Sequence, residues 1–242
     1  MMRGTVLRRA SGAAAAFALG CGVVACSPGY DECGGEESCV ESLSPPVTAA
    51  PGTGAVIGDP TLLSAGLLAA ADLPGEFGVL PPREDGTGSA VPSESPTDPP
   101  DCARLLTPIA EQWPGSAAAA SVHFAGPGFA TIDIDAAGYA DAALPSAFGA
   151  LQALPRRCRA YSGDEAGVRI DYLTDTLEQP SAGDANAAFT LTATSEGLTI
   201  TSQVALVQVG NTLVQLVVTA PESVDPGVLA DLTAAQVRKL RG

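Results

Sequence analysis

The chain has 242 residues, of which 46% are hydrophobic, and it carries a formal net charge of −15. Nucleic-acid binding needs an electropositive face for the phosphates, so this acidic composition excludes nucleic acid as an expected partner. The length is enough for one domain of roughly 140 residues with its own core, together with a leader and a linker.

The first 25 residues are typical of a lipoprotein signal peptide. Three arginines precede an apolar stretch over residues 12–25, and Cys26 follows the small residues that a signal peptidase requires. We expect cleavage after residue 25 and lipid on Cys26, with Cys21 as the alternative site. The apolar run falls short of the roughly 20 residues that span a bilayer, which disfavours an anchor that stays uncut.

Cleavage would make the chain still more acidic. Residues 1–25 hold three arginines and no acid, so 9 basic side chains would remain against 27 acidic ones, a net charge of −18. Such a surface is repelled by anionic lipids, and the lipid on Cys26 must therefore hold the protein. We expect a monomer at the extracytoplasmic face of the cell membrane, with membrane lipid as a partner only through this anchor.

Four further cysteines predict disulfides: Cys33, Cys39, Cys102 and Cys158. In an oxidising compartment they allow three pairings. We favour Cys33 with Cys39, which closes a short acidic loop, and Cys102 with Cys158, which joins two helical ends of the main domain. The competing zinc site lacks a CxxC pair, and His123 is the only histidine. No metal and no cofactor is expected.

Composition divides the rest of the chain. Residues 26–60 are rich in Gly, Pro, Ser and acids and have little to bury, which predicts a disordered tether from the lipidated cysteine. A short helical segment associated with the domain is expected over 61–80. Residues 81–101 form a Pro/Ser-rich loop or linker, because the prolines block regular structure. The globular domain is predicted over 102–242.

Within the domain the patterns alternate between helix and strand. Asp101 can cap a first helix that ends near Trp113, a second helix spans about 146–154, and Asp225-Pro226 opens the last. Gly210-Asn211 is a two-residue hairpin signal. The expected strands are 121–125, 129–135, 168–173, 188–193, 198–209 and 212–219. Connections this short predict an α+β fold, an antiparallel sheet of about six strands packed against helices on one face.

Three residues on the first two strands have the chemistry of a catalytic site. Alternation puts Asp133 and Asp135 on one face, which fits a carboxylate pair or a calcium site, although a solvated, charged sheet face is the favoured interpretation. His123 is predicted to be a half-exposed strand residue, and the chain has no G-x-S-x-G motif. We therefore expect no enzyme.

A basic cluster, Arg156, Arg157 and Arg159, follows the second helix. It could receive an anionic ligand or an acidic partner. The alternative is that it supplies local counter-charges in an acidic protein. We retain these arginines as possible ligand-binding residues.

Several short segments occur in a recognisable order, namely Ala71-Asp72-Leu73-Pro74-Gly75-Glu76-Phe77, Cys102 opening a helix, Leu154-Pro155-Arg156-Arg157-Cys158, 207–214 and 235–240. The arrangement resembles actinobacterial lipoproteins whose domain is similar to the extracellular sensor domain of the mycobacterial kinase PknH. The resemblance implies an antiparallel sheet with helices on one side, a disulfide tying helix to sheet and a cleft for an unidentified ligand. It lends no catalytic residues.

The expected function is a non-catalytic ligand-binding or sensor-like domain of a cell-envelope lipoprotein. Its ligand would be an unknown small molecule or protein. One alternative is an interaction or scaffold lipoprotein that docks a membrane-protein partner. Another is an envelope hydrolase that uses Asp133 and Asp135.

Overall fold

The structure, a computed structural model, describes residues 43–74, 76–81, 96–221 and 224–242. The chain divides into two units, and these residues belong to the second, Val40–Gly242. None of the helices within the described ranges has the length and apolar composition that crossing a bilayer requires.

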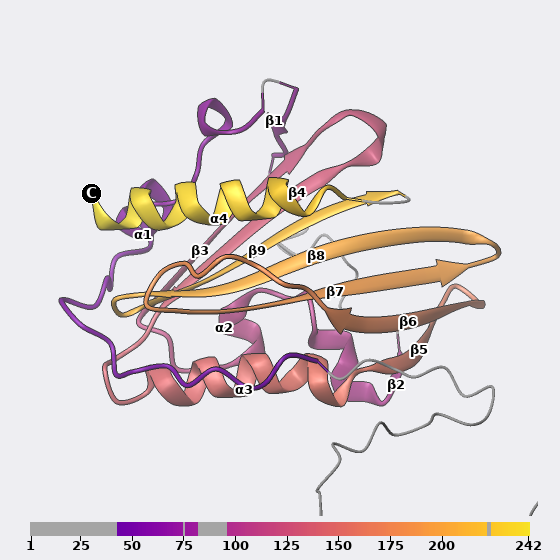
Figure 1. Ribbon diagram of the computed structural model, residues 1–242, viewed down its shortest axis with the longest axis horizontal. Helices are drawn as coiled ribbons and strands as arrows, with labels where there is room; N and C mark the ends of the chain where they lie inside the picture. The colour runs from indigo at the N-terminus through magenta and orange to yellow at the C-terminus, as the bar shows by residue number, and fades with distance from the viewer. Residues whose placement is uncertain (1–42, 75, 82–95, 222–223) are drawn as a thin grey trace, which may run out of the picture. The chain divides into compact units, whose positions relative to one another are not determined.

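A nine-stranded antiparallel sheet organises the second unit, in the order β1-β3-β4-β9-β8-β7-β6-β5-β2 (Figure 1). The strands are β1 (Gly78–Val79), β2 (Thr97–Asp98), β3 (Ala118–Ala125), β4 (Thr131–Gly138), β5 (Ala160–Glu165), β6 (Val168–Thr176), β7 (Ala185–Ser195), β8 (Leu198–Val209) and β9 (Thr212–Pro221). The α+β class is confirmed, but the sheet exceeds the expected six strands. Two residues are too few to show a period in β1 and β2, and β5 reads Ala-Tyr-Ser-Gly-Asp-Glu, with few strand formers.

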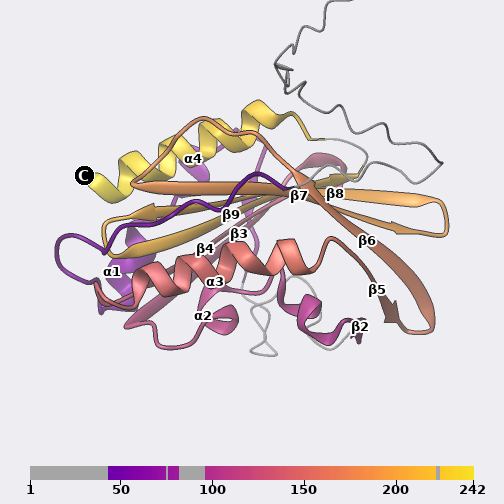
Figure 2. The ribbon, with the colours of Figure 1, turned by 60° about the horizontal axis from the view of Figure 1, so that its bottom comes forward.

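Helices cover both faces of the sheet, so the expected one-sided arrangement is wrong. The helices are α1 (Pro60–Ala65), α2 (Ile109–Gln112), α3 (Leu144–Arg157) and α4 (Pro226–Arg241), with short 3-10 turns η1 (Ala70–Asp72), η2 (Pro100–Arg104) and η3 (Pro127–Phe129). Figure 2 shows α4 and α3 on opposite sides of the strands. We call the α1 and α4 side the first face and the α2 and α3 side the second face.

The central strands explain the two-sided cover. On β8, Ala205 and Val207 belong to the apolar core beneath α4, whereas Val204 and Leu206 point to the second face. A strand that is apolar on both sides must be buried on both sides, and it reads as a continuous hydrophobic run. The second helical layer therefore follows from the sequence of β8 and its neighbour β9.

The disulfide between Cys102 and Cys158 is present, with the two Cα atoms 5.7 Å apart. It joins η2 to the C-terminal end of α3 on the second face. The other expected pair, Cys33 with Cys39, lies outside the described residues.

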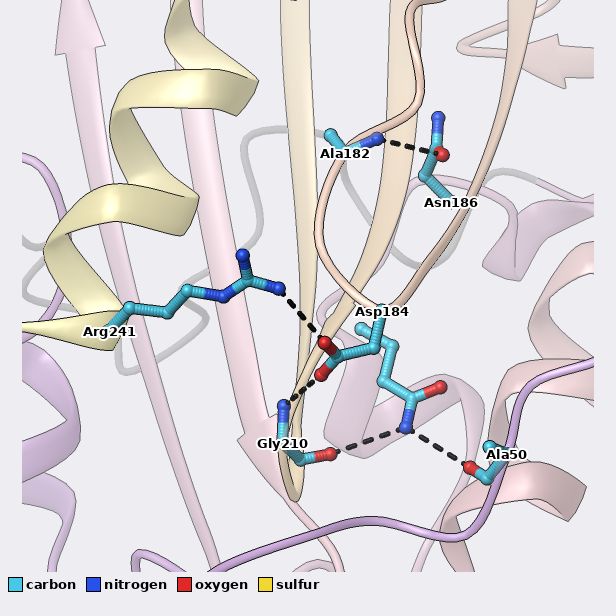
Figure 3. Close-up of polar contacts among 7 residues, drawn as sticks. Ala50, Ala182, Asp184, Asn186, Gly210 and Arg241 are labelled. Atoms are coloured by element: carbon cyan, nitrogen blue, oxygen red, sulfur yellow. Dashed lines mark hydrogen bonds and ion pairs between the residues drawn. The ribbon is translucent and has the colours of Figure 1, made fainter.

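The described chain begins with an extended segment, residues 43–54, which we call the strap. Side-chain amides hold its backbone. Val47 N donates to Gln152 Oε1 at 2.9 Å, and Gln152 Nε2 donates back to Val47 O at 2.6 Å. Gln208 Nε2 donates to Ala50 O at 3.1 Å. Figure 3 shows Ala50 near Gly210 of the β8–β9 turn.

Glycine fixes the strap against that turn. A Cβ at Gly52 would lie 1.5 Å from Asn211 Oδ1, so a larger residue does not fit there. Asn211 Nδ2 donates to Gly54 O at 2.8 Å. Part of the expected tether, 26–60, thus lies against the domain. Composition did not indicate this, because Leu43 and Ala49 are the strap's only buried apolar side chains and many of its other contacts are hydrogen bonds to backbone groups that every sequence carries.

The last turn of α4 is tied to the same end of the sheet. Asp184, which precedes β7, accepts hydrogen bonds from Gly210 N at 2.6 Å and from Arg241 Nη2 at 2.9 Å (Figure 3). The carboxylate therefore links the β8–β9 turn to the C-terminal helix. Lys239, in the same turn of α4, pairs with Asp72 at 2.6 Å.

Candidate functional site: a cleft on the second face

The second face is covered over only half of its length. Helices α3 and α2 pack on the half near the β8–β9 turn, through residues such as Leu206 and Leu213. The other half lines a cleft of about 490 Å³. Strands β3 to β9 all contribute side chains to it, and Leu106 and Pro108 border it from the segment between η2 and α2.

An apolar strip forms the middle of the cleft. It consists of Val217 on β9, Leu198 and Ile200 on β8, Leu191 on β7 and Ile170 on β6. Leu198 is 75% exposed and Ile200 is 48% exposed. Removing apolar surface from water gains about 25 cal/mol of free energy per Å², so this strip favours an apolar ligand.

A row of polar side chains lies beside the strip on β3 and β4. The register places His123 opposite Asp133 and Ser121 opposite Asp135. His123 Nδ1 and Asp133 Oδ1 are 2.7 Å apart, and the Ser121 hydroxyl donates to Asp135. Thr131 Oγ1 donates to the second oxygen of Asp133 at 3.2 Å. Both oxygens of Asp133 and one oxygen of Asp135 thus have a hydrogen-bond partner.

Asp135 is 3% exposed, so the interpretation of these acids as a solvated sheet face is wrong. Burial raises the pKa of Asp135 to about 6, although the Ser121 hydroxyl and the charge of His123 both act to lower it. Burial disfavours the charged form of a carboxylate, and the neighbouring Asp133 adds repulsion. The carboxyl group therefore changes charge near neutral pH.

Tyr172 closes the cleft on the side of β6. Its ring stacks on that of Tyr161 with centroids 4.6 Å apart and planes 9° from parallel. Burial, with a smaller effect of Glu165, raises the pKa of Tyr172 above its ordinary value. The phenol therefore stays neutral at physiological pH and offers a hydrogen bond without a charge.

Of the three predicted arginines, Arg156 alone lines a pocket in the described chain. Arg156 lines a second, smaller pocket of about 340 Å³ between the strap, α3 and β7, where it donates to Ser44 O. Arg157 is exposed, and Arg159 is half-buried at the start of β5. None of the three lines the larger cleft in the described chain. Their role as ligand-binding residues stays a prediction.

Sequence reasoning missed most of the cleft. Glu165, Tyr172 and Ile200 come from strands that are far from Asp133 in the sequence. In β8, Thr199 and Thr201 alternate with Leu198 and Ile200, whereas 204–207 is continuously apolar. The threonines lie on the first face, so this change in pattern gave no signal for the cleft on the second face.

Among the described residues, no three or more His, Cys, Asp or Glu side chains are grouped so that they could hold a metal ion. The arrangement can instead surround a molecule of moderate size, with an apolar body on the strip and hydrogen bonds at its polar edges. Small-molecule sites usually have volumes of roughly 300 to 1,000 Å³, and the volume of this cleft lies within that range.

Comparison with solved structures identifies the fold. The chain is similar to the extracellular domain of PknH from Mycobacterium tuberculosis, with a TM-score of 0.58 and 16% identity over 77% of this chain and 98% of that one. An uncharacterized protein from Mycobacterium smegmatis matches with a TM-score of 0.41 and 17% identity, covering 71% and 93% of the two chains. No protein-family model and no curated protein matches the sequence. The resemblance predicted to the extracellular domain of PknH is therefore confirmed at the level of the fold.

Proposed function

We propose that this chain is a non-catalytic ligand-binding domain, held by lipid on Cys26 at the extracytoplasmic face of the cell membrane. The cleft on the second face is its binding site. The observation that carries this proposal is the apolar strip, in which Leu198 and Ile200 are open to solvent within a cavity of about 490 Å³. The shared fold with an extracellular domain supports the location.

A charged residue in the strip should weaken the binding of an apolar probe. We expect Ile200→Glu to weaken the binding of N-phenyl-1-naphthylamine by about tenfold or more, because the ligand would have to desolvate a carboxylate. Ile200 is 48% exposed, so the variant should still fold. Fluorescence titration of the chain from Ser27 to Gly242, which holds the whole folded unit, measures the effect.

Leu62→Glu is the matched control, since Leu62 is 65% exposed on α1, which packs on the first face. It introduces the same charge away from the cleft and should bind the probe like the parent chain. Equal losses in both variants, or no binding to the parent, would contradict the proposed site.

The anchor predicts a covalent mass. Protein extracted from membranes should carry a diacylglycerol-sized increment that disappears in Cys26→Ala, because only a cysteine thiol accepts this lipid. Cys21→Ala is the control and should retain the increment. Intact-mass measurement decides between the two sites, and an increment that follows Cys21 or is absent from the parent would overturn the assignment of Cys26.

A docking role is favoured by a different observation. Phe129, in the turn between β3 and β4, is 90% exposed. Protein interfaces often use a solvent-exposed aromatic ring of this kind as an anchor. If a cellular phenotype that depends on this protein persists in Ile200→Glu but is lost in Phe129→Ser, the interaction lipoprotein is the better description.

A further inference from the structure

We propose that the cleft selects amphipathic organic cations, molecules with an apolar body and an amine or quaternary ammonium head. This inference rests on the proposed function and specifies the ligand class of the same site. The juxtaposition that carries it is an apolar strip bordered by carboxylates on both sides.

The topology produces that juxtaposition. The sheet order β4-β9-β8-β7-β6-β5 puts Asp133 and Asp135 on β4 at one side of the strip and Glu165 on β5 at the other. Glu196, in the turn that joins β7 to β8, lines the same cleft. A ligand whose body covers Ile200 and its neighbours therefore meets an acidic side chain whichever way its head points.

Positive charge is scarce in the lining. Of the described residues that border the cleft, His123 alone is a basic type, and it already faces Asp133 at 2.7 Å. The basic cluster of Arg156, Arg157 and Arg159 contributes Arg156 to the smaller pocket and no residue to the cleft. An anionic head, such as a carboxylate or sulfate, would be repelled here, whereas a cation would find complementary charge.

The same groups give the selectivity a pH dependence. The charged and titratable side chains that act on Asp135 are His123 on β3, Asp133 on β4 and Glu111 on α2. Glu165 and Glu196, which we call the rim pair, line the same cleft. As the pH rises from 5 to 8, Asp135 loses its proton and the cleft becomes more negative. Preference for a cation should therefore increase over this range.

Competition with ten-carbon compounds tests the proposal on the chain from Ser27 to Gly242. Decyltrimethylammonium, decanol and decyl sulfate, each below its critical micelle concentration, are titrated against bound N-phenyl-1-naphthylamine at low ionic strength. We expect the cation to displace the probe at a concentration about tenfold lower than the sulfate, with the alcohol between them, and the ratio to shrink in salt.

Two double variants separate local from general attraction. Glu165→Gln with Glu196→Gln should reduce the ratio of cation to sulfate by at least about threefold, because each removes a charge at the rim. Glu178→Gln with Asp231→Asn changes the net charge equally at positions outside the cleft and should leave the ratio unchanged.

The outcomes distinguish the two proposals. Probe binding with equal displacement by all three competitors, or with stronger displacement by the sulfate, overturns the cation preference and leaves the binding site standing. Failure of the probe to bind at all overturns both. A ratio that falls as much in the control pair as in the rim pair attributes the preference to net charge and also overturns the inference.

Discussion

Replacing both Cys102 and Cys158 with alanine is expected to lower the free energy of unfolding by about 4 kcal/mol. The disulfide closes a loop with a sequence separation of 56 residues. In the chain-entropy description, a crosslink over roughly this many residues removes about that much conformational freedom from the unfolded chain. For a domain of this size the melting temperature should fall by about 10 to 15 °C.

Urea and thermal unfolding under non-reducing conditions measure the loss. The comparison is best made in a Cys33→Ala, Cys39→Ala background, where Cys102 and Cys158 form the remaining pair of the chain from Ser27 onward. Reductant should then reproduce the loss in the parent and have no effect on the alanine variant. A parent that is insensitive to reductant would show that the bond contributes little to stability.

Replacing Asp135 with asparagine is expected to stabilise the protein above pH 7 and to leave it nearly unchanged at pH 4. The folded-state pKa of this carboxyl group is raised from 3.8 to about 6, so the folded protein binds its proton more tightly than the unfolded chain does. Both states are protonated below about pH 4, whereas above pH 6 the folded state must hold a buried charge. Ionisation thus removes up to about 3 kcal/mol of stability as the pH rises through this window.

Asparagine removes that ionisation and can still accept the hydrogen bond from Ser121. The difference between variant and parent in unfolding free energy should therefore grow from pH 4 to pH 8, which urea titrations at several pH values will measure. Asp171→Asn is the control, because Asp171 is exposed and pairs with Arg169 at the surface. A variant at position 135 that is less stable than the parent at pH 8 would mean that the carboxylate's hydrogen bond outweighs its burial.

Local chemistry predicted the elements that depend on neighbouring residues. The Asp225 side chain accepts from Gly227 N at 2.8 Å and begins α4 as expected, and Gly210 adopts a φ of 57° in the β8–β9 turn. These features need only a few consecutive residues, so sequence reasoning finds them. The bounds predicted for the strand over 198–209 agree with those of β8.

The second helical layer and the cleft depend on contacts between distant segments. Asp133 and Asp135 were placed correctly on one strand face, but alternation says nothing about what covers that face. Asp135 is 3% exposed on β4, against which α2 packs. For the same reason the pKa of Asp135 could not be read from its neighbours in sequence.

The docked strap limits how far an acylated protein could stand from a bilayer. If the tether ended at Pro60, roughly 34 residues would follow Cys26, but the described chain is already packed at Leu43, at most roughly 17 residues after Cys26. Fully extended, 17 residues reach about 60 Å at most. The point where the strap joins the domain would then stay within about 60 Å of the headgroups. A pull on the lipid would load the contacts of Leu43 and Ser44 before the hydrogen bonds at Val47.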